Sequence, residues 1–127
     1  MTNSQFDNLP KTIICDIDGC IFMHQGSLPN MILNPAELCP NVKEQFDDWD
    51  KKAYKIILLT GRKESMRDVT EKQLRSFGLF WDHLVMGATR GERILVNDIK
   101  PSCEQNTASA INLIRNKGFA RIEKPSE

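Results

Sequence analysis

Four short aliphatic runs punctuate the chain, and amphipathic or polar stretches separate them. The runs are Thr12 to Cys15, Ile56 to Leu59, Leu84 to Met86 and Ile94 to Val96. Each is too short for a helix and lacks polar alternation, which is typical of strands that are covered on both faces. Strands that alternate with helices predict an α/β fold, a Rossmann-like three-layer α/β/α sandwich with a mostly parallel sheet. A weaker fifth strand is expected over Phe119 to Ile122.

Three stretches between these runs have helical periodicity. The first places Val42, Phe46, Trp49 and Ala53 on one helical face. The second runs from Met66 to Phe77, just before Gly78, and the third runs from Ser102 to Ile114, before Gly118. The segment 22–40 lacks periodicity and is rich in glycine and proline, so we expect a loop there with at most a short hairpin.

Length and composition predict one cytoplasmic domain over residues 1–127. A chain of 14.5 kDa forms one compact core, and its 17 basic residues balance its 17 acidic ones, so net charge indicates no partner. We expect no signal peptide and no membrane association, because the N-terminus is polar and no segment is long and apolar enough to span a bilayer. The four cysteines form no CxxC pair and are expected to be reduced, packed thiols.

The first run leads directly into two carboxylates, Asp16 and Asp18, which precede Gly19. Alternation along an extended chain can direct both acids to one side, at the strand end where open α/β sheets bind ligands. Two adjacent acids repel, so a bound hard cation, typically Mg²⁺, explains their ionised state. One carboxylate can then attack a phosphoryl group while the other transfers protons. A pair of solvated turn aspartates is the alternative for this motif alone.

Two further runs also end in polar residues. The second ends in Thr60, Gly61 and Arg62, which can bind an anionic phosphate through a hydroxyl, backbone amides and a guanidinium. The fourth ends in Asp98, which would complete a set of oxygen ligands. Core packing requires only the apolar residues before these positions, so the three strand ends together indicate function.

These motifs resemble those of the haloacid dehalogenase-like (HAD) hydrolase superfamily over nearly the whole chain. The family has an apolar run followed by DxDx[T/V], then a strand-terminal Thr or Ser, and later a strand-terminal acid. The resemblance implies a phosphoric monoester hydrolase that depends on Mg²⁺. Its implied nucleophile is Asp16, which would form an aspartyl-phosphate. Asp18 would be the general acid and base, Thr60 a phosphate ligand, and Asp98 a ligand of the metal together with the first two acids.

The chain departs from the family pattern at three places. Cys20 stands where many members have Thr or Val, and Asn97 stands where many have an acid. The third motif is usually a Lys that neutralises the nucleophile and the phosphate, and here the candidates are Arg90, Arg93 and Lys100. The spacing to Asp98 favours Arg90, with Arg93 expected to flank the strand.

The segment between the first two motifs is too short for the inserted cap domain of the family, so we expect a capless protein with an open site. Expected substrates are phosphorylated small molecules, such as sugar phosphates or nucleotides, and nucleic-acid ends stay open. His24, Gln25 and Ser27 lie where the family has a mobile flap. Two alternatives are a non-catalytic phosphate-binding module of the same fold and a receiver-like domain that is phosphorylated on an aspartate. The receiver is disfavoured because the middle strands end without an acid.

Overall fold

A three-stranded parallel sheet forms the centre of the protein. The computed structural model describes residues 9–99 and 107–119. The strands are β1 (Thr12–Asp16), β2 (Lys55–Leu59) and β3 (His83–Val85), and their order in the sheet is β1-β2-β3. Ile14 pairs with Ile57, and Leu58 pairs with Leu84. The expected parallel α/β fold is therefore confirmed, and the first three predicted strands form within one or two residues of their expected ends.

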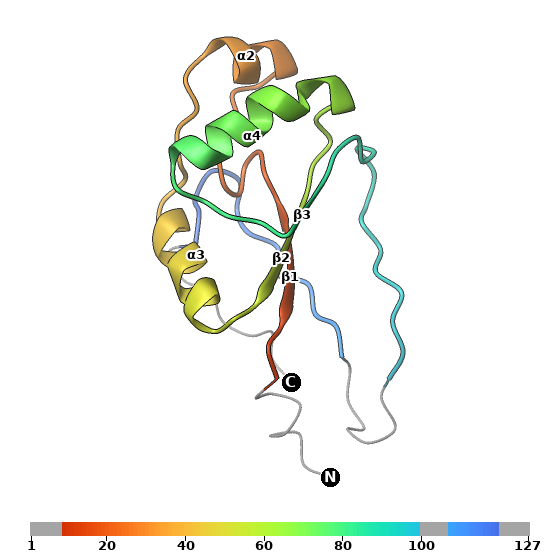
Figure 1. Ribbon diagram of the computed structural model, residues 1–127. Coiled ribbons are helices and arrows are strands. Elements are labelled where there is room, and N and C mark those ends of the chain that lie inside the picture. The colour runs from red at the N-terminus through yellow and green to blue at the C-terminus, as the bar shows by residue number, and fades with distance from the viewer. Residues whose placement is uncertain (1–8, 100–106, 120–127) are drawn as a thin grey trace.

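Two helices connect the strands, and both were expected from periodicity. Helix α3 (Val42–Lys51) joins β1 to β2, and α4 (Arg67–Ser76) joins β2 to β3 after a 3-10 turn at Glu64–Met66. Figure 1 shows α3 beside one face of the sheet, with α4 lying across its upper end, where the strands terminate. The parallel crossovers bring the carboxyl ends of all three strands to this one edge.

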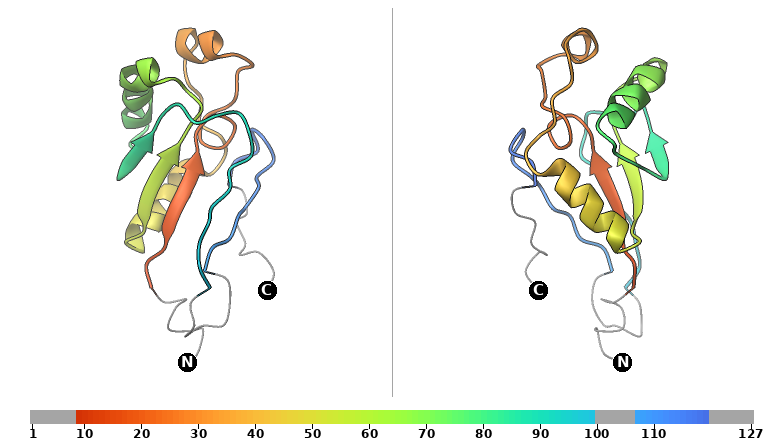
Figure 2. Two further views of the ribbon diagram at one scale, coloured as in Figure 1. Left: turned by 90° about the vertical axis from the view of Figure 1, so that its right-hand side faces the viewer. Right: turned by 60° about the vertical axis from the view of Figure 1, so that its left-hand side comes forward.

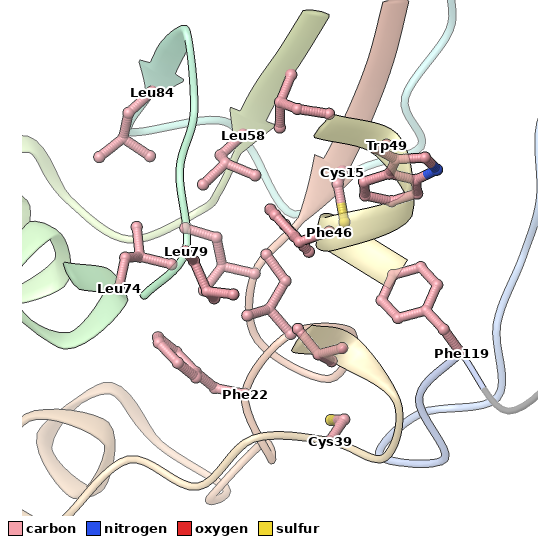
Figure 3. Packing of buried hydrophobic residues seen from close by; sticks show 14 residues of the cluster. Cys15, Phe22, Cys39, Phe46, Trp49, Leu58, Leu74, Leu79, Leu84 and Phe119 are labelled. Atoms are coloured by element: carbon pink, nitrogen blue, oxygen red, sulfur yellow. The ribbon is translucent and has the colours of Figure 1, made fainter. Parts of the chain in front are cut away.

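The core lies between α3, α4 and one face of the sheet, as Figure 3 shows in close-up. Every second residue of the strands faces it, so the strands alternate between buried and more exposed positions. On the opposite face, Ile14 keeps 50% of its surface exposed and Val85 keeps 44%. The core residues are Cys15, Ile17, Ile21, Phe22, Cys39, Val42, Phe46, Trp49, Ile56, Leu58, Leu74, Leu79, Leu84 and Phe119.

The segment between β1 and α3 contains a helix that periodicity did not predict. Helix α2 (Leu28–Leu33) begins after Ser27, whose hydroxyl accepts a hydrogen bond from the backbone N–H of Asn30. Pro29 lies in its first turn, where the missing N–H has no cost. A local cap and a favourable proline thus produce one and a half turns of helix where we expected a loop or a hairpin.

The fourth predicted strand does not form. Residues 86–99 run as an extended segment back along the sheet, next to a second extended segment, 107–114 (Figures 1 and 2). Ile94 and Val96 are exposed, at 76% and 89%, and no strand is formed in this part of the described chain. An aliphatic run favours a strand only where it finds a pairing partner, which this one lacks here.

The third predicted helix is also not observed in the part of the chain that can be compared. Its residues 107–114 are extended rather than helical, and its residues 102–106 lie outside the described ranges. The predicted fifth strand is described only at Phe119, which is not in a strand. In the two described ranges, no helix is long and apolar enough to cross a membrane.

Candidate active site

Asp16 is the last residue of β1 and therefore lies at the carboxyl edge of the sheet. Its Oδ1 accepts a hydrogen bond of 2.8 Å from the backbone N–H of Ile17, which fixes the carboxylate. Its side chain remains 41% exposed. Partial burial raises the pKa of Asp16, the neighbouring charge of Asp18 raises it further, and the Ile17 N–H, Arg93 and Arg115 oppose this rise. The side chain is thus an oriented carboxylate with one oxygen, Oδ2, directed away from the backbone bond.

A tight turn follows Asp16 and depends on Gly19. The backbone N–H groups of Cys20, Ile21 and Phe22 all donate to the carbonyl of Ile17, and Gly19 adopts φ +92°, which favours glycine. The pKa of the Cys20 thiol is raised to about 11, by burial and then by the charge of Asp16. Cys20 therefore stays protonated and is not a competing nucleophile.

A late segment of the chain clasps this turn. The backbone N–H of Asn116 donates to the carbonyl of Gly19 at 2.8 Å, and the Asn116 side-chain oxygen accepts from the N–H of His24 at 2.7 Å. Gly118 lies so close to Pro40 that a Cβ there would meet the proline carbonyl oxygen at 2.1 Å. We call residues 116–119 the clasp, because they join the turn after Asp16 to the segment before α3.

Asp18 is held by Arg62 in a two-pronged ion pair. Arg62 Nε donates to Asp18 Oδ2 at 2.9 Å, and Arg62 Nη2 donates to Asp18 Oδ1 at 2.8 Å. The Arg62 side chain is only 1% exposed and that of Asp18 is 12% exposed. The structure thus joins two residues that the sequence placed in one site, but it joins them to each other.

Thr60 and Gly61 form the loop between β2 and the 3-10 turn. Thr60 is buried, and its hydroxyl oxygen accepts a hydrogen bond of 3.0 Å from the backbone N–H of Arg62. Its hydrogen can still be donated, because a hydroxyl is both donor and acceptor. Gly61 is exposed beside Ala88. Their binding of phosphate stays a prediction.

The cation at Asp16 is Arg93 in this structure. Its Nη1 lies 4.0 Å from Asp16 Oδ2. Arg115 also acts on the charge of Asp16, and its aliphatic stem packs over Gly19. Arg90, which spacing favoured, is exposed and forms no ion pair within the described residues, and Lys100 lies outside them. The structure therefore supports Arg93 in the role expected for Arg90.

Asp98 lies apart from the other two acids. It is near the end of the segment 86–99, which runs from the carboxyl edge of the sheet toward its amino edge (Figure 2). Its backbone carbonyl accepts from the hydroxyl of Thr107, and its side chain helps to line a small hollow between the two extended segments. No group of three or more acidic, histidine or cysteine side chains that could hold a metal is found among the described residues.

Several residues of this arrangement were missed from the sequence. Thr70 and Gln73 bind Arg62, and Arg115 and Asn116 contact the turn. One signal was present: Thr70 is a polar residue in the core-facing stripe of its helix, which indicates a buried polar partner. His24, Gln25 and Ser27 make local hydrogen bonds in the segment around α2.

The raised pKa of Asp16 leads to a prediction for stability. Because the folded state disfavours the ionised form, ionised Asp16 destabilises the fold at any pH above its raised pKa, and this cost disappears below its usual value of 3.8. Asp16→Asn should therefore raise the melting temperature by a few degrees at most at pH 7 and leave it unchanged at pH 3. Thermal unfolding across this pH range measures the difference. A variant that is less stable at pH 7 would contradict the pKa direction.

The fold and this edge of the sheet define a small Rossmann-like α/β protein with a carboxylate at the end of its first parallel strand. Two solved structures resemble it. One, of the Pnkp1/Rnl/Hen1 complex, has a TM-score of 0.55 and 32% identity over 68% of this chain and 31% of that chain. The other, of the Pnkp1/Rnl/Hen1 RNA repair complex, has a TM-score of 0.54 and 32% identity over 67% of this chain and 28% of that chain.

This chain therefore spans about a third of the length of those chains. No protein-family model matches the sequence, and no curated protein matches it.

Proposed function

We propose that the protein is a HAD-type phosphatase that hydrolyses a phosphate monoester through an aspartyl-phosphate on Asp16. The observation that carries this proposal is the oriented and partly exposed Asp16 carboxylate at the carboxyl edge of a parallel sheet. A second acid, Asp18, follows it on the same turn. A nucleophile, a proton carrier and a nearby cation are thus contributed by neighbouring parts of one site.

In the first step, Asp16 Oδ2 attacks the phosphorus of the substrate. Oδ1 is occupied by the Ile17 N–H, so Oδ2 is the free oxygen, and it is also the one that Arg93 faces. A bond forms between Oδ2 and phosphorus, and the bond from phosphorus to the leaving oxygen breaks. The departing alcohol takes a proton from protonated Asp18 when it is a poor leaving group.

In the second step, water attacks the aspartyl-phosphate. Asp18, now a carboxylate, accepts a proton from the water, and the bond between phosphorus and Oδ2 breaks. Inorganic phosphate leaves, and Asp16 regains its charge. Thr60, with its hydroxyl hydrogen available, would donate to the phosphoryl oxygens, together with the backbone at Gly61.

The residues at this edge fit Mg²⁺ only in part. Asp16 presents one carboxylate oxygen without a backbone partner, but both oxygens of Asp18 accept from Arg62 and Asp98 lies apart. Asp16, Asp18 and Asp98 are the residues that would hold the ion. When bound, it would neutralise negative charge on the phosphoryl group.

Substitution of Asp98 tests its place in the metal site. If Asp98 is a ligand, Asp98→Asn should raise the Mg²⁺ concentration for half-maximal activity by about tenfold, because an amide is a poorer partner for a hard dication than a carboxylate. Metal titrations of the wild type, Asp98→Asn and the exposed control Glu92→Gln measure the shift. Superimposable curves for all three would exclude Asp98 from the site.

RNA ends with a terminal phosphate are the substrate class that we favour over free sugar phosphates and nucleotides. The similarity to chains of an RNA repair complex supports this choice. Arg93 and Arg115 also place positive charge near Asp16 without a cap domain over it. The remaining part of the similar chains has no counterpart here, so the activities of those proteins as a whole are not transferred.

A phosphate-release screen tests the function and the substrate together. The substrates are 3′- and 5′-phosphorylated RNA oligonucleotides, the matching DNA, mononucleotides, sugar phosphates and an aryl phosphate, each with and without Mg²⁺. We expect Mg²⁺-dependent release, fastest with an RNA end. No release from any substrate, with phosphate still bound, would instead favour the non-catalytic module.

A further inference from the structure

We propose that Arg62 is a positioning residue that holds Asp18 as the general base for hydrolysis of the aspartyl-phosphate. This inference rests on the proposed phosphatase activity and assigns a role within that same site. It replaces our expectation from sequence that Arg62 binds the substrate phosphate.

The geometry of the pair is the first reason. The two parallel hydrogen bonds, 2.9 Å and 2.8 Å long, occupy both oxygens of Asp18 with one edge of the guanidinium. A planar guanidinium fixes a carboxylate in both position and rotation, which a lysine ammonium cannot do. Asp18 accepts on both oxygens, as an ionised carboxylate does, and this is the form that removes a proton from water.

The second reason is that Arg62 is itself immobilised from behind. Its Nη1 donates to Thr70 Oγ1 at 2.9 Å and to Gln73 Oε1 at 2.7 Å, both on α4. Its guanidinium carbon lies 5.7 Å from the centre of the Phe22 ring. The far side of the arginine is thus anchored to a packed helix and an aromatic ring, so the near side has a defined orientation.

The third reason is that little of Arg62 remains for a substrate. Four of its five N–H groups are used, two by Asp18 and two by α4, and its side chain is 1% exposed. A phosphate could reach this guanidinium only by displacing the carboxylate. Gln73 also donates to the carbonyl of Met31 in α2, which ties the same network to the segment after the turn.

The experiment separates the two chemical steps with a radiolabelled aryl phosphate, whose leaving group needs no proton. Arg62→Lys should leave the initial burst of phenol within about threefold of the wild type, because Asp16 is untouched. Its steady-state rate should fall by about tenfold or more, because Asp18 is no longer aimed at the water. Labelled phosphoenzyme should therefore accumulate, as it should in Asp18→Asn.

A double variant and two further variants complete the test. Asp18→Asn with Arg62→Lys should be no slower than Asp18→Asn alone, since Arg62 acts through Asp18. Gln73→Met should show the same accumulation with a smaller loss, about threefold, and it carries the test if Arg62→Lys does not fold. Arg75→Lys, an exposed arginine on the same helix, should behave as the wild type.

The outcomes are distinguishable from failure of the proposed function. A wild-type protein with no turnover would sink the phosphatase and this role together. An active wild type in which Arg62→Lys loses the burst, raises KM and adds its loss to that of Asp18→Asn would show direct phosphate binding. Normal steady-state rates in both Arg62→Lys and Gln73→Met would also overturn the proposal.

Discussion

Asp16→Asn should reduce turnover by at least about a thousandfold while the protein stays folded. The amide keeps the shape of the side chain and can still accept the Ile17 N–H, but it lacks the charge that attacks phosphorus. Phosphate release with the best substrate from the screen measures the loss. Circular dichroism and thermal unfolding confirm that the fold is retained.

The matched control is Asp47→Asn, which changes an exposed acid on α3 that pairs only with Lys43 across the helix surface. It should retain wild-type turnover. Trapping with BeF₃⁻ followed by nuclear magnetic resonance should place the adduct on Asp16 in the wild type. Normal turnover in folded Asp16→Asn, or an adduct on another acid, would refute the mechanism.

Arg93→Ala should reduce turnover by on the order of a hundredfold, the usual loss when a fixed donor to a transferring group is removed. Arg93 lies 4.0 Å from the attacking oxygen, so its charge can stabilise the phosphoryl group as it is transferred. Arg93→Lys should recover part of the loss, because the charge returns without the planar fork. Steady-state kinetics of the three proteins measure these differences.

Arg90→Ala and Lys100→Ala are the comparisons for this prediction, since the sequence allowed all three cations. Arg90→Ala should remain within about threefold of the wild type, because Arg90 is exposed and makes no ion pair among the described residues. If Arg90→Ala or Lys100→Ala is the crippled variant and Arg93→Ala is normal, the cation comes from another part of this segment than the structure indicates.

The sequence predicted the sheet and its acids well because both depend on local patterns. Aliphatic runs of three to five residues sufficed for β1, β2 and β3, and regular apolar spacing sufficed for α3 and α4. Asp16 could be placed at a strand end because the apolar run stops there. These features need no knowledge of distant contacts.

The remainder depends on contacts between distant residues. Arg62 bonds to Asp18 across 44 positions of sequence, and no local pattern distinguishes a guanidinium that binds an acid from one that binds phosphate. Ile94 to Val96 has the composition of a strand but no partner, so composition alone misled. Whether Asp98 binds metal stays a prediction.

The clasp has a consequence for the synthesis of the protein. Asn116 binds the N–H of His24 from 92 positions further along the chain, and Phe119 binds the carbonyl of Pro40. A ribosome releases the chain from its N-terminus, so Asp16 and its turn emerge long before the residues that secure them. The nascent protein can pair β1 with β2 and pack α3 early, but its catalytic turn is completed among the last events of folding.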